Sequence, residues 1–185
     1  MKNKIFKASK IYIFLLAIYF LGFSNVSADV IGGRWEQSSI NFYFENSSSY
    51  MEEVKIFREA LNKWTTGLNK NGINILLNLT SDKSKAHVNV KMEDILSPGA
   101  GGWTDLYPSK SSKVYTGGII KFDPTYTAAN YDDCEANMLH EIGHILGLND
   151  QLHEKNSIMY QQVYAATTTI PTTYDYNDLK SIYLK

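Results

Sequence analysis

The order of the sequence patterns predicts an α+β fold in one domain. The 185 residues are of single-domain length, and 44% of them are hydrophobic, which is enough to build a core. The chain reads as strand, helix, several strands, helix, irregular segment and helix. Because strands and helices are grouped instead of alternating strictly, this order favours a mixed layout with segregated helices.

The first strand and the first helix follow from residues 40–68. Residues 40–44 alternate as a half-buried strand does. Ser49 and Glu52 stand at capping-box spacing, and glycines at 67 and 72 mark the end of the helix they begin. Apolar side chains recur every three or four residues between these points, which predicts an amphipathic helix. They are Met51, Val54, Phe57, Leu61, Trp64 and Leu68.

The middle of the chain supplies the remaining strands. Residues 73–79 and 86–92 read as two strands, the second with clear alternation. Residues 97–116 are rich in glycine, serine and proline, which predicts a loop. A short strand is expected at residues 118–122.

Two helices are predicted in the last third of the chain. One covers residues 132–148, where Asp132 and Glu135 stand at capping-box spacing and Gly147 provides a stop. Residues 149–173 are threonine-rich and predicted to be irregular. The last helix begins near Tyr174. Its apolar face contains Tyr176, Leu179, Ile182 and Tyr183.

Charge and cysteine content narrow the function classes. The chain has 18 Lys and Arg against 19 Asp and Glu, so its formal net charge is −1. This balance gives no electrostatic reason to expect nucleic acid as a partner. The single cysteine, Cys134, excludes an internal disulfide framework and a cysteine-rich zinc cluster. We expect this lone thiol to be buried and inert.

The N-terminal segment has the order of a secretory signal peptide. Four lysines and no acids occupy residues 1–10, residues 11–23 are uniformly apolar, and Val26-Ser27-Ala28 offers a cleavage site. The apolar run is shorter than the ~20 residues of a spanning helix, so we expect no membrane contact after cleavage. We therefore predict a signal peptide at residues 1–28 and an extracellular domain at residues 29–185. Cleavage changes the formal net charge from −1 to −5, because four lysines and no acids leave.

A metal-binding pattern lies in the second predicted helix. His140-Glu141-Ile142-Gly143-His144 places two imidazoles at positions i and i+4, on one helix face, where both can bind one ion. Glu141 is one step round the helix and can reach a water on the metal. This is the HExxH arrangement for a zinc ion and a general base.

The residues after the helix extend the pattern. Gly147 lets the chain leave the helix sharply, so that a third ligand can return to the metal. Asp150 is the preferred third ligand because of its spacing from Gly147 and because carboxylates bind zinc. His153 is the alternative.

At this point the sequence resembles the metzincin metalloproteases, and within them the matrixin branch. The elongated zinc motif is followed by Ser157-Ile158-Met159-Tyr160, which is similar to the Met-turn beneath the metal. Residues 119–123 resemble the strand before the matrixin zinc helix, and Gly102-Trp103-Thr104 stands where the family has its substrate-binding edge strand. The resemblance implies a twisted, mostly parallel small sheet with a backing helix, a zinc helix, a Met-turn and a C-terminal helix.

Several positions depart from the matrixin pattern. Asp150 stands where matrixins have a third histidine, and is similar to the snapalysin pattern. The histidines of a structural zinc site are not evident, so one catalytic Zn²⁺ is expected. The acidic partner of a calcium site is missing after Asp123, which argues against Ca²⁺. Residues 29–34 leave no room for a propeptide, so latency through a cysteine switch is not expected.

These observations predict a secreted zinc endopeptidase that acts as a monomer on protein or peptide substrates. Zinc lowers the pKa of its water to ~7, and Glu141 removes the proton as the water attacks the scissile carbonyl. Met159 is expected to pack beneath the site and not to bind the metal. The alternative is a catalytically inactive secreted zinc-binding module on the same scaffold; the presence of Glu141 favours the enzyme.

Overall fold

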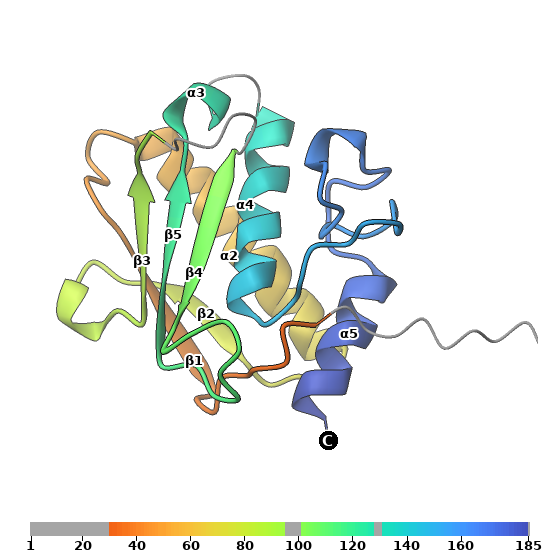
Figure 1. The fold of residues 1–185 in the computed structure, drawn as a ribbon. Coiled ribbons are helices and arrows are strands. Elements are labelled where there is room, and N and C mark those ends of the chain that lie inside the picture. The colour runs from red at the N-terminus through yellow and green to blue at the C-terminus, as the bar shows by residue number, and fades with distance from the viewer. Residues whose placement is uncertain (1–29, 95–100, 128–130, 185) are drawn as a thin grey trace, which may run out of the picture.

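The computed structural model describes residues 30–94, 101–127 and 131–184. One five-stranded sheet and three long or medium helices make up most of it (Figure 1). The strands are β1 (Ser39–Phe44), β2 (Leu76–Leu79), β3 (Val88–Met92), β4 (Gly102–Tyr107) and β5 (Gly117–Phe122). The helices are α2 (Met51–Lys70), α3 (Pro124–Thr127), α4 (Tyr131–Ile145) and α5 (Thr173–Tyr183), with short 3₁₀ turns η1 (Lys83–Lys85) and η2 (Val163–Ala165).

The sheet is mostly parallel, with one antiparallel strand at its edge. The strand order is β2-β1-β3-β5-β4. The first four strands in this order pair in parallel, whereas β4 runs antiparallel to β5, with Gly102 opposite Phe122 and Tyr107 opposite Gly117. The predicted small, mostly parallel sheet is thus confirmed. One side of β4 faces away from the sheet, so its backbone is placed to pair with an added chain.

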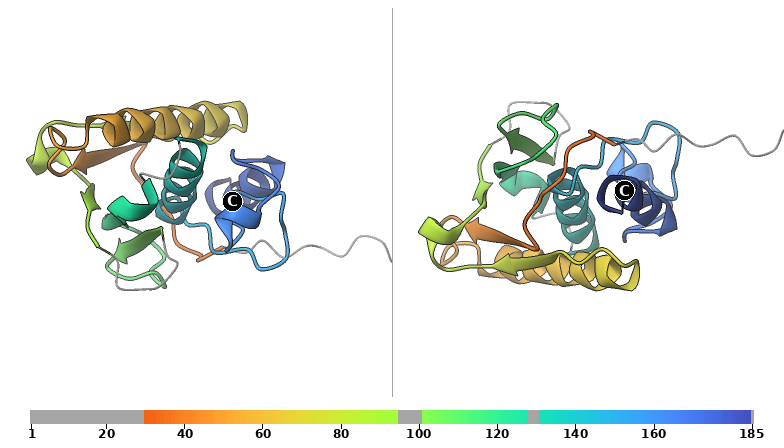
Figure 2. Two further views of the ribbon diagram at one scale, coloured as in Figure 1. Left: turned by 90° about the horizontal axis from the view of Figure 1, so that it is seen from above. Right: turned by 90° about the horizontal axis from the view of Figure 1, so that it is seen from below.

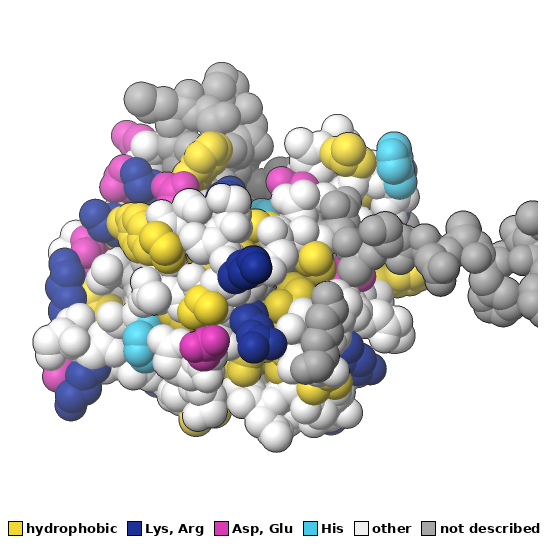
Figure 3. Space-filling view, turned by 60° about the horizontal axis from the view of Figure 1, so that its bottom comes forward, with side chains coloured by type: hydrophobic (Ala, Val, Ile, Leu, Met, Phe, Trp, Pro, Cys, Tyr) yellow, Lys and Arg dark blue, Asp and Glu magenta, His cyan; other side chains and the backbone are white. Residues whose placement is uncertain are grey.

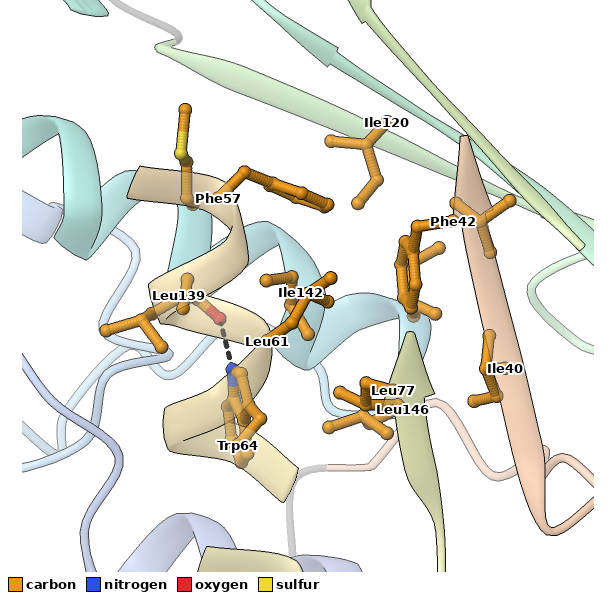
Figure 4. Packing of buried hydrophobic residues seen from close by; sticks show 14 of the residues in the cluster. Ile40, Phe42, Phe57, Leu61, Trp64, Leu77, Ile120, Leu139, Ile142 and Leu146 are labelled. Carbon is orange, nitrogen blue, oxygen red and sulfur yellow. Dashed lines mark hydrogen bonds between the residues drawn. The ribbon is translucent and has the colours of Figure 1, made fainter. Parts of the chain in front are cut away.

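The core lies between the sheet and α2. Strand β1 buries every second side chain, and the inward Phe42 meets Phe57 of α2 edge to face at a centroid distance of 5.7 Å. Trp64, about two turns further along α2 in the same stripe, is fully buried and donates from Nε1 to the carbonyl oxygen of Leu139 on α4 at 2.9 Å (Figure 4). This bond and the surrounding apolar contacts hold α4 against α2. Helix α2 is thus the backing helix that the resemblance implies.

Helix α4 occupies the centre of the molecule. Seen from above and below, α2 lies along one side, and α4 stands between the sheet and α5 (Figure 2). The apolar face of α5 packs inward as predicted, with Leu179 and Ile182 buried. The hydroxyl of Tyr183 donates to the carbonyl oxygen of Leu146 at 2.9 Å, which ties the end of α5 to the end of α4.

Both capping boxes predicted from the sequence are wrong. Helix α2 begins after Tyr50 with no side-chain cap, because the Ser49 backbone is already used in a turn that donates to Asn46. Met51 is 75% exposed and does not belong to the core face. Asp132 lies within the first turn of α4 instead of capping it. A capping box does form at the start of α5, between Thr172 and Asp175.

The predicted loop at residues 97–116 is also partly wrong. Its segment 102–107 forms β4, since Thr104 and Leu106 alternate inward and bury their side chains against α4 and the sheet. The resemblance placed an edge strand at Gly102-Trp103-Thr104, and that expectation is confirmed. Helix α3 was not predicted. Residues 149–172 are irregular apart from η2, as expected.

The signal peptide and the burial of Cys134 were also predicted from the sequence. The predicted signal peptide at residues 1–28 lies outside the described residues. Among the residues that are described, no helix combines the length and apolar character needed to cross a membrane. Cys134 is buried as predicted, and burial raises the pKa of its thiol to about 12.

Candidate metal centre and active site

Helix α4 brings His140, Glu141 and His144 together at the base of a cleft. All three side chains are buried, and their potential ligand atoms lie within 4.8 Å of one another. The two imidazole rings meet edge to face with centroids 4.8 Å apart. This juxtaposition follows from the i, i+4 spacing in a regular helix. The group could hold a metal ion.

Hydrogen bonds orient both histidines with the same ring nitrogen toward the cleft. His140 donates from Nδ1 to the carbonyl oxygen of Ile158 at 2.9 Å, and His144 donates from Nδ1 to that of Leu148 at 3.0 Å. Because a carbonyl oxygen only accepts, each Nδ1 carries the proton and each Nε2 keeps a lone pair for a metal. Backbone carbonyls commonly fix the tautomer of metal-binding histidines in this way.

Gly147 turns the chain back toward the helix. Its φ of +102° lies in the left-handed region, and a Cβ at this position would lie 2.6 Å from the carbonyl oxygen of Gly33. The reversal brings Oδ1 of Asp150 to 3.2 Å from Nε2 of His140 and 3.6 Å from Nε2 of His144. His153 is exposed and forms no part of this cluster.

The spacing of these donor atoms fits a zinc ion. Ligand atoms ~2.0–2.1 Å from a tetrahedral metal lie roughly 3.3 Å apart, which is close to both Asp150–histidine separations. Two imidazoles and one carboxylate are also a ligand set that zinc accepts. The residues present therefore fit the group that the motif implies.

The three groups are coupled electrostatically. Burial opposes the charged form of His140, but the Asp150 and Glu141 carboxylates outweigh it and raise its pKa. Burial and the neighbouring His140 lower the pKa of His144. Burial also opposes ionisation of Asp150, yet the neighbouring His140, His144 and Lys110 outweigh it and leave its pKa below the ordinary value.

Strand β4 shapes the surroundings of Glu141. Thr104 is buried and donates from Oγ1 to Oε2 of Glu141 at 2.6 Å. Gly102 makes room for the same side chain, because a Cβ there would lie 2.5 Å from Cγ of Glu141. The resemblance to matrixins implied that both residues lie on a substrate-binding edge strand, but the sequence gave no sign that they contact Glu141.

The turn that contains Met159 lies under the helix. Met159 is buried, and a Cβ on Gly143 would come within 2.3 Å of its Sδ, so the thioether fills the space that this glycine leaves. Met159 donates from its backbone N–H to Oγ of Ser157 at 2.9 Å. The predicted packing position of Met159 beneath the histidines agrees with this geometry.

Asp175 of α5 anchors this turn, and sequence reasoning missed it. Its carboxylate is almost fully buried and accepts from the hydroxyl of Ser157 and from the backbone N–H of Ile158 at 3.3 Å. It also accepts from the N–H of Thr172 at 2.6 Å. Since the carbonyl oxygen of Ile158 in turn accepts from His140, Asp175 is linked to the histidine through the backbone of this one residue. The capping-box spacing of Thr172 and Asp175 was the available signal.

The cleft above these groups has a volume of about 410 Å³. Helix α4 forms its base, β4 forms one wall, and the segment before η2 forms the other. Besides the residues already described, its lining includes Trp103, Lys110, Asn137, Gln161, Gln162 and Val163.

Comparison with known proteins identifies a similar fold. No family model matches the sequence, and no curated protein matches it in sequence. Among solved structures, that of myroilysin matches with a TM-score of 0.56 at 14% identity, over 84% of this chain and 98% of that chain. The likeness concerns the fold. It agrees with the arrangement described above and confirms the predicted metzincin-like α+β class.

Proposed function

We propose that the chain is a secreted zinc endopeptidase. The observation that carries the proposal is the convergence of Nε2 of His140, Nε2 of His144 and Oδ1 of Asp150 at zinc-ligand spacing, with Glu141 beside them in an open cleft. Three protein ligands leave a fourth position for water, as in catalytic zinc sites and unlike closed structural ones.

Each residue of the site has a distinct role in the proposed hydrolysis of a peptide bond. Zinc, when bound, supplies a Lewis acid that polarises the scissile carbonyl and makes water acidic enough to ionise near neutrality. Glu141 removes a proton from the attacking water and returns it to the leaving amine nitrogen. Thr104 holds one oxygen of that carboxylate, so the other can turn toward the cleft. His140, His144 and Asp150 hold the metal.

The edge of the sheet provides a docking place for the substrate backbone. Strand β4 borders the cleft, and among the described strands it pairs with β5 alone. A peptide in extended form would add to its free side through backbone hydrogen bonds, which requires no particular side chain. Protein or peptide substrates are therefore the class that the cleft fits.

The wider context rests on the sequence. The basic, apolar and small-residue order of residues 1–28 supports export with cleavage after Ala28 and action outside the cell, where we propose that the protein acts as a monomer. On the face in Figure 3, basic side chains are interspersed with acidic and uncharged ones, which offers no extended basic surface to nucleic acid. The Asp150 ligand and the Met159 turn support a matrixin-like enzyme with the snapalysin ligand pattern.

Substitution of Glu141 tests the proposal. The exported protein and its Glu141→Ala variant are loaded with zinc, their metal content is measured, and cleavage of a mixed peptide library is followed by mass spectrometry. We expect equal zinc content and a loss of turnover by several orders of magnitude, because Glu141 moves the proton and does not bind the metal. Glu36→Ala, an exposed acid outside the cleft, is the matched control and retains activity.

Two other results would contradict the proposal in different ways. A zinc-loaded wild type that cleaves nothing would indicate the inactive zinc-binding module instead. Loss of zinc from Glu141→Ala would mean that Glu141 is a ligand.

A further inference from the structure

The ammonium group of Lys110 lies at the rim of the cleft. Lys110 lines the cleft, and among the described residues it forms no ion pair with a carboxylate. Other lysines of the fold are paired closely, Lys63 with Glu135 at 2.6 Å and Lys121 with Glu93 at 2.7 Å. An unpaired ammonium group at a binding cleft is available to a ligand.

The backbone of Lys110 is held in place. Its carbonyl oxygen accepts from the hydroxyl of Tyr115 at 3.1 Å, and Tyr115 is fully buried. The same hydroxyl accepts from the backbone N–H of Gly33 at 3.1 Å. The turn is closed by a bond from Ser112 N–H to the carbonyl oxygen of Ser109. The lysine is therefore presented from an anchored turn.

The side chain of Lys110 lies over an aromatic platform. Its Nζ is 5.5 Å from the ring centroid of Trp103, within cation–π range. Trp103 is on the edge strand and 48% exposed, so its indole is open to a bound peptide. The pair offers an apolar face beside a positive charge.

Lys110 determines the net charge of the cleft when zinc is bound. The carboxylates of Glu141 and Asp150 line the cleft, and in the proposed zinc site their two negative charges balance the dication. Lys110 then leaves the cleft with one net positive charge, whereas residues 29–185 together carry −5. A substrate with a negative side chain near Lys110 gains from this field, since the cleft walls screen it less than bulk water does.

We propose that Lys110 and Trp103 form a subsite that selects an acidic residue, Asp or Glu, in the peptide substrate. The methylene groups of the substrate side chain lie against the indole, and its carboxylate pairs with Nζ of Lys110. This inference rests on the proposed function and names the substrate class of that site.

Cleavage profiles of three variants test the subsite. A library of blocked peptides is digested with zinc-loaded wild type, Lys110→Gln and Lys110→Glu, and residue frequencies around the cleaved bond are compared. We expect one position where wild type favours Asp and Glu over Asn and Gln by roughly three- to fivefold, the range for a partly exposed ion pair. The preference disappears in Lys110→Gln and changes to Lys and Arg in Lys110→Glu. Lys113→Gln, an exposed lysine on the same segment but outside the cleft, keeps the wild-type profile.

A binding measurement separates this inference from the proposed function. Zinc-loaded Glu141→Ala and Glu141→Ala/Lys110→Gln are titrated with two peptide pools that differ only in Glu against Gln, and tryptophan fluorescence is recorded; Trp103 is exposed, while Trp35 and Trp64 are buried. Tighter binding of the Glu pool that is lost without Lys110 supports the subsite even if no peptide is cleaved. Equal binding of both pools, or a preference that survives Lys110→Gln, overturns it.

Discussion

Thr104 on the edge strand donates a 2.6 Å hydrogen bond to the carboxylate of Glu141 on the central helix. The two residues are 37 positions apart, and the bond forms because β4 packs beside α4 (Figure 1). The strand proposed to dock the substrate thus also orients the proposed general base. Movement of the strand on substrate binding would reach Glu141 directly.

Removal of this donor should reduce turnover without loss of the metal. In Thr104→Val the shape of the side chain is kept and the hydroxyl is lost. A hydrogen bond to a charged group contributes about 1.5–3 kcal/mol, so we expect kcat to fall by roughly ten- to a hundredfold. KM and zinc content should stay near wild type, and Thr104→Ser should restore most of kcat. An unchanged kcat in Thr104→Val would show that the bond does not position Glu141.

Asp175 should stabilise the protein and the metal site together. The carboxylate of Asp175 accepts from the backbone N–H groups of Ile158 and Thr172. In Asp175→Asn one carboxylate oxygen becomes an NH₂ group, which is a donor and cannot accept from an N–H group. We expect a loss of about 2–4 kcal/mol in the free energy of unfolding, with Asp94→Asn, an exposed acid, as the unaffected control.

The same variant should bind zinc about tenfold more weakly, because Ile158 would no longer hold His140 as firmly. Chemical denaturation of the metal-free protein and zinc titration of the folded protein measure the two effects separately. Destabilisation with unchanged zinc affinity would restrict Asp175 to a structural role.

The thiol of Cys134 should not react with thiol reagents in the folded protein. Burial raises its pKa to about 12, so at pH 8 only about one thiol in ten thousand is ionised, and the thiolate is the reactive form. We expect a chromogenic disulfide reagent to detect no free thiol in the native protein at pH 8 and one per chain in guanidinium chloride. Rapid reaction of the native protein would mean that α4 opens readily at this point.

Local spacing made most of the fold and the centre of the site predictable. The two histidines and Glu141 share a helix turn, and Gly147 is a position where the backbone itself demands glycine. The strands and the core faces of α2 and α5 follow from periodicity in the same way.

The features that the sequence did not reveal depend on contacts between distant segments. Thr104 meets Glu141 and Asp175 meets Ser157 only after the sheet and helices have packed. Competing local structure explains the two failed capping boxes. The backbone N–H of Ser49 donates to Asn46 in a turn. Asp132 lies inside α4 and cannot cap it, because the helix begins one residue earlier, at Tyr131.

The identity of the third zinc ligand can be tested directly, because the sequence left Asp150 and His153 as alternatives. In the structure Asp150 lies against both histidines, while His153 is exposed three residues further on. For His153 to bind, the chain after Gly147 would have to fold back over a longer path. That path would also break the bond from Gln151 N–H to the carbonyl oxygen of Met159, which is 2.7 Å long.

We therefore expect Asp150→Ala to weaken zinc binding by at least a hundredfold and His153→Ala to leave it within about twofold of wild type, since removal of one of three ligands costs far more than removal of an exposed side chain. Competition with a chromophoric zinc chelator at neutral pH measures both affinities. Asp150→Asn is the matched variant that keeps the size of the side chain but removes the anion, and it should fall between the two. If His153→Ala instead strips the metal while Asp150→Ala retains it, the ligand assignment is reversed and the loop after Gly147 must rearrange when zinc binds.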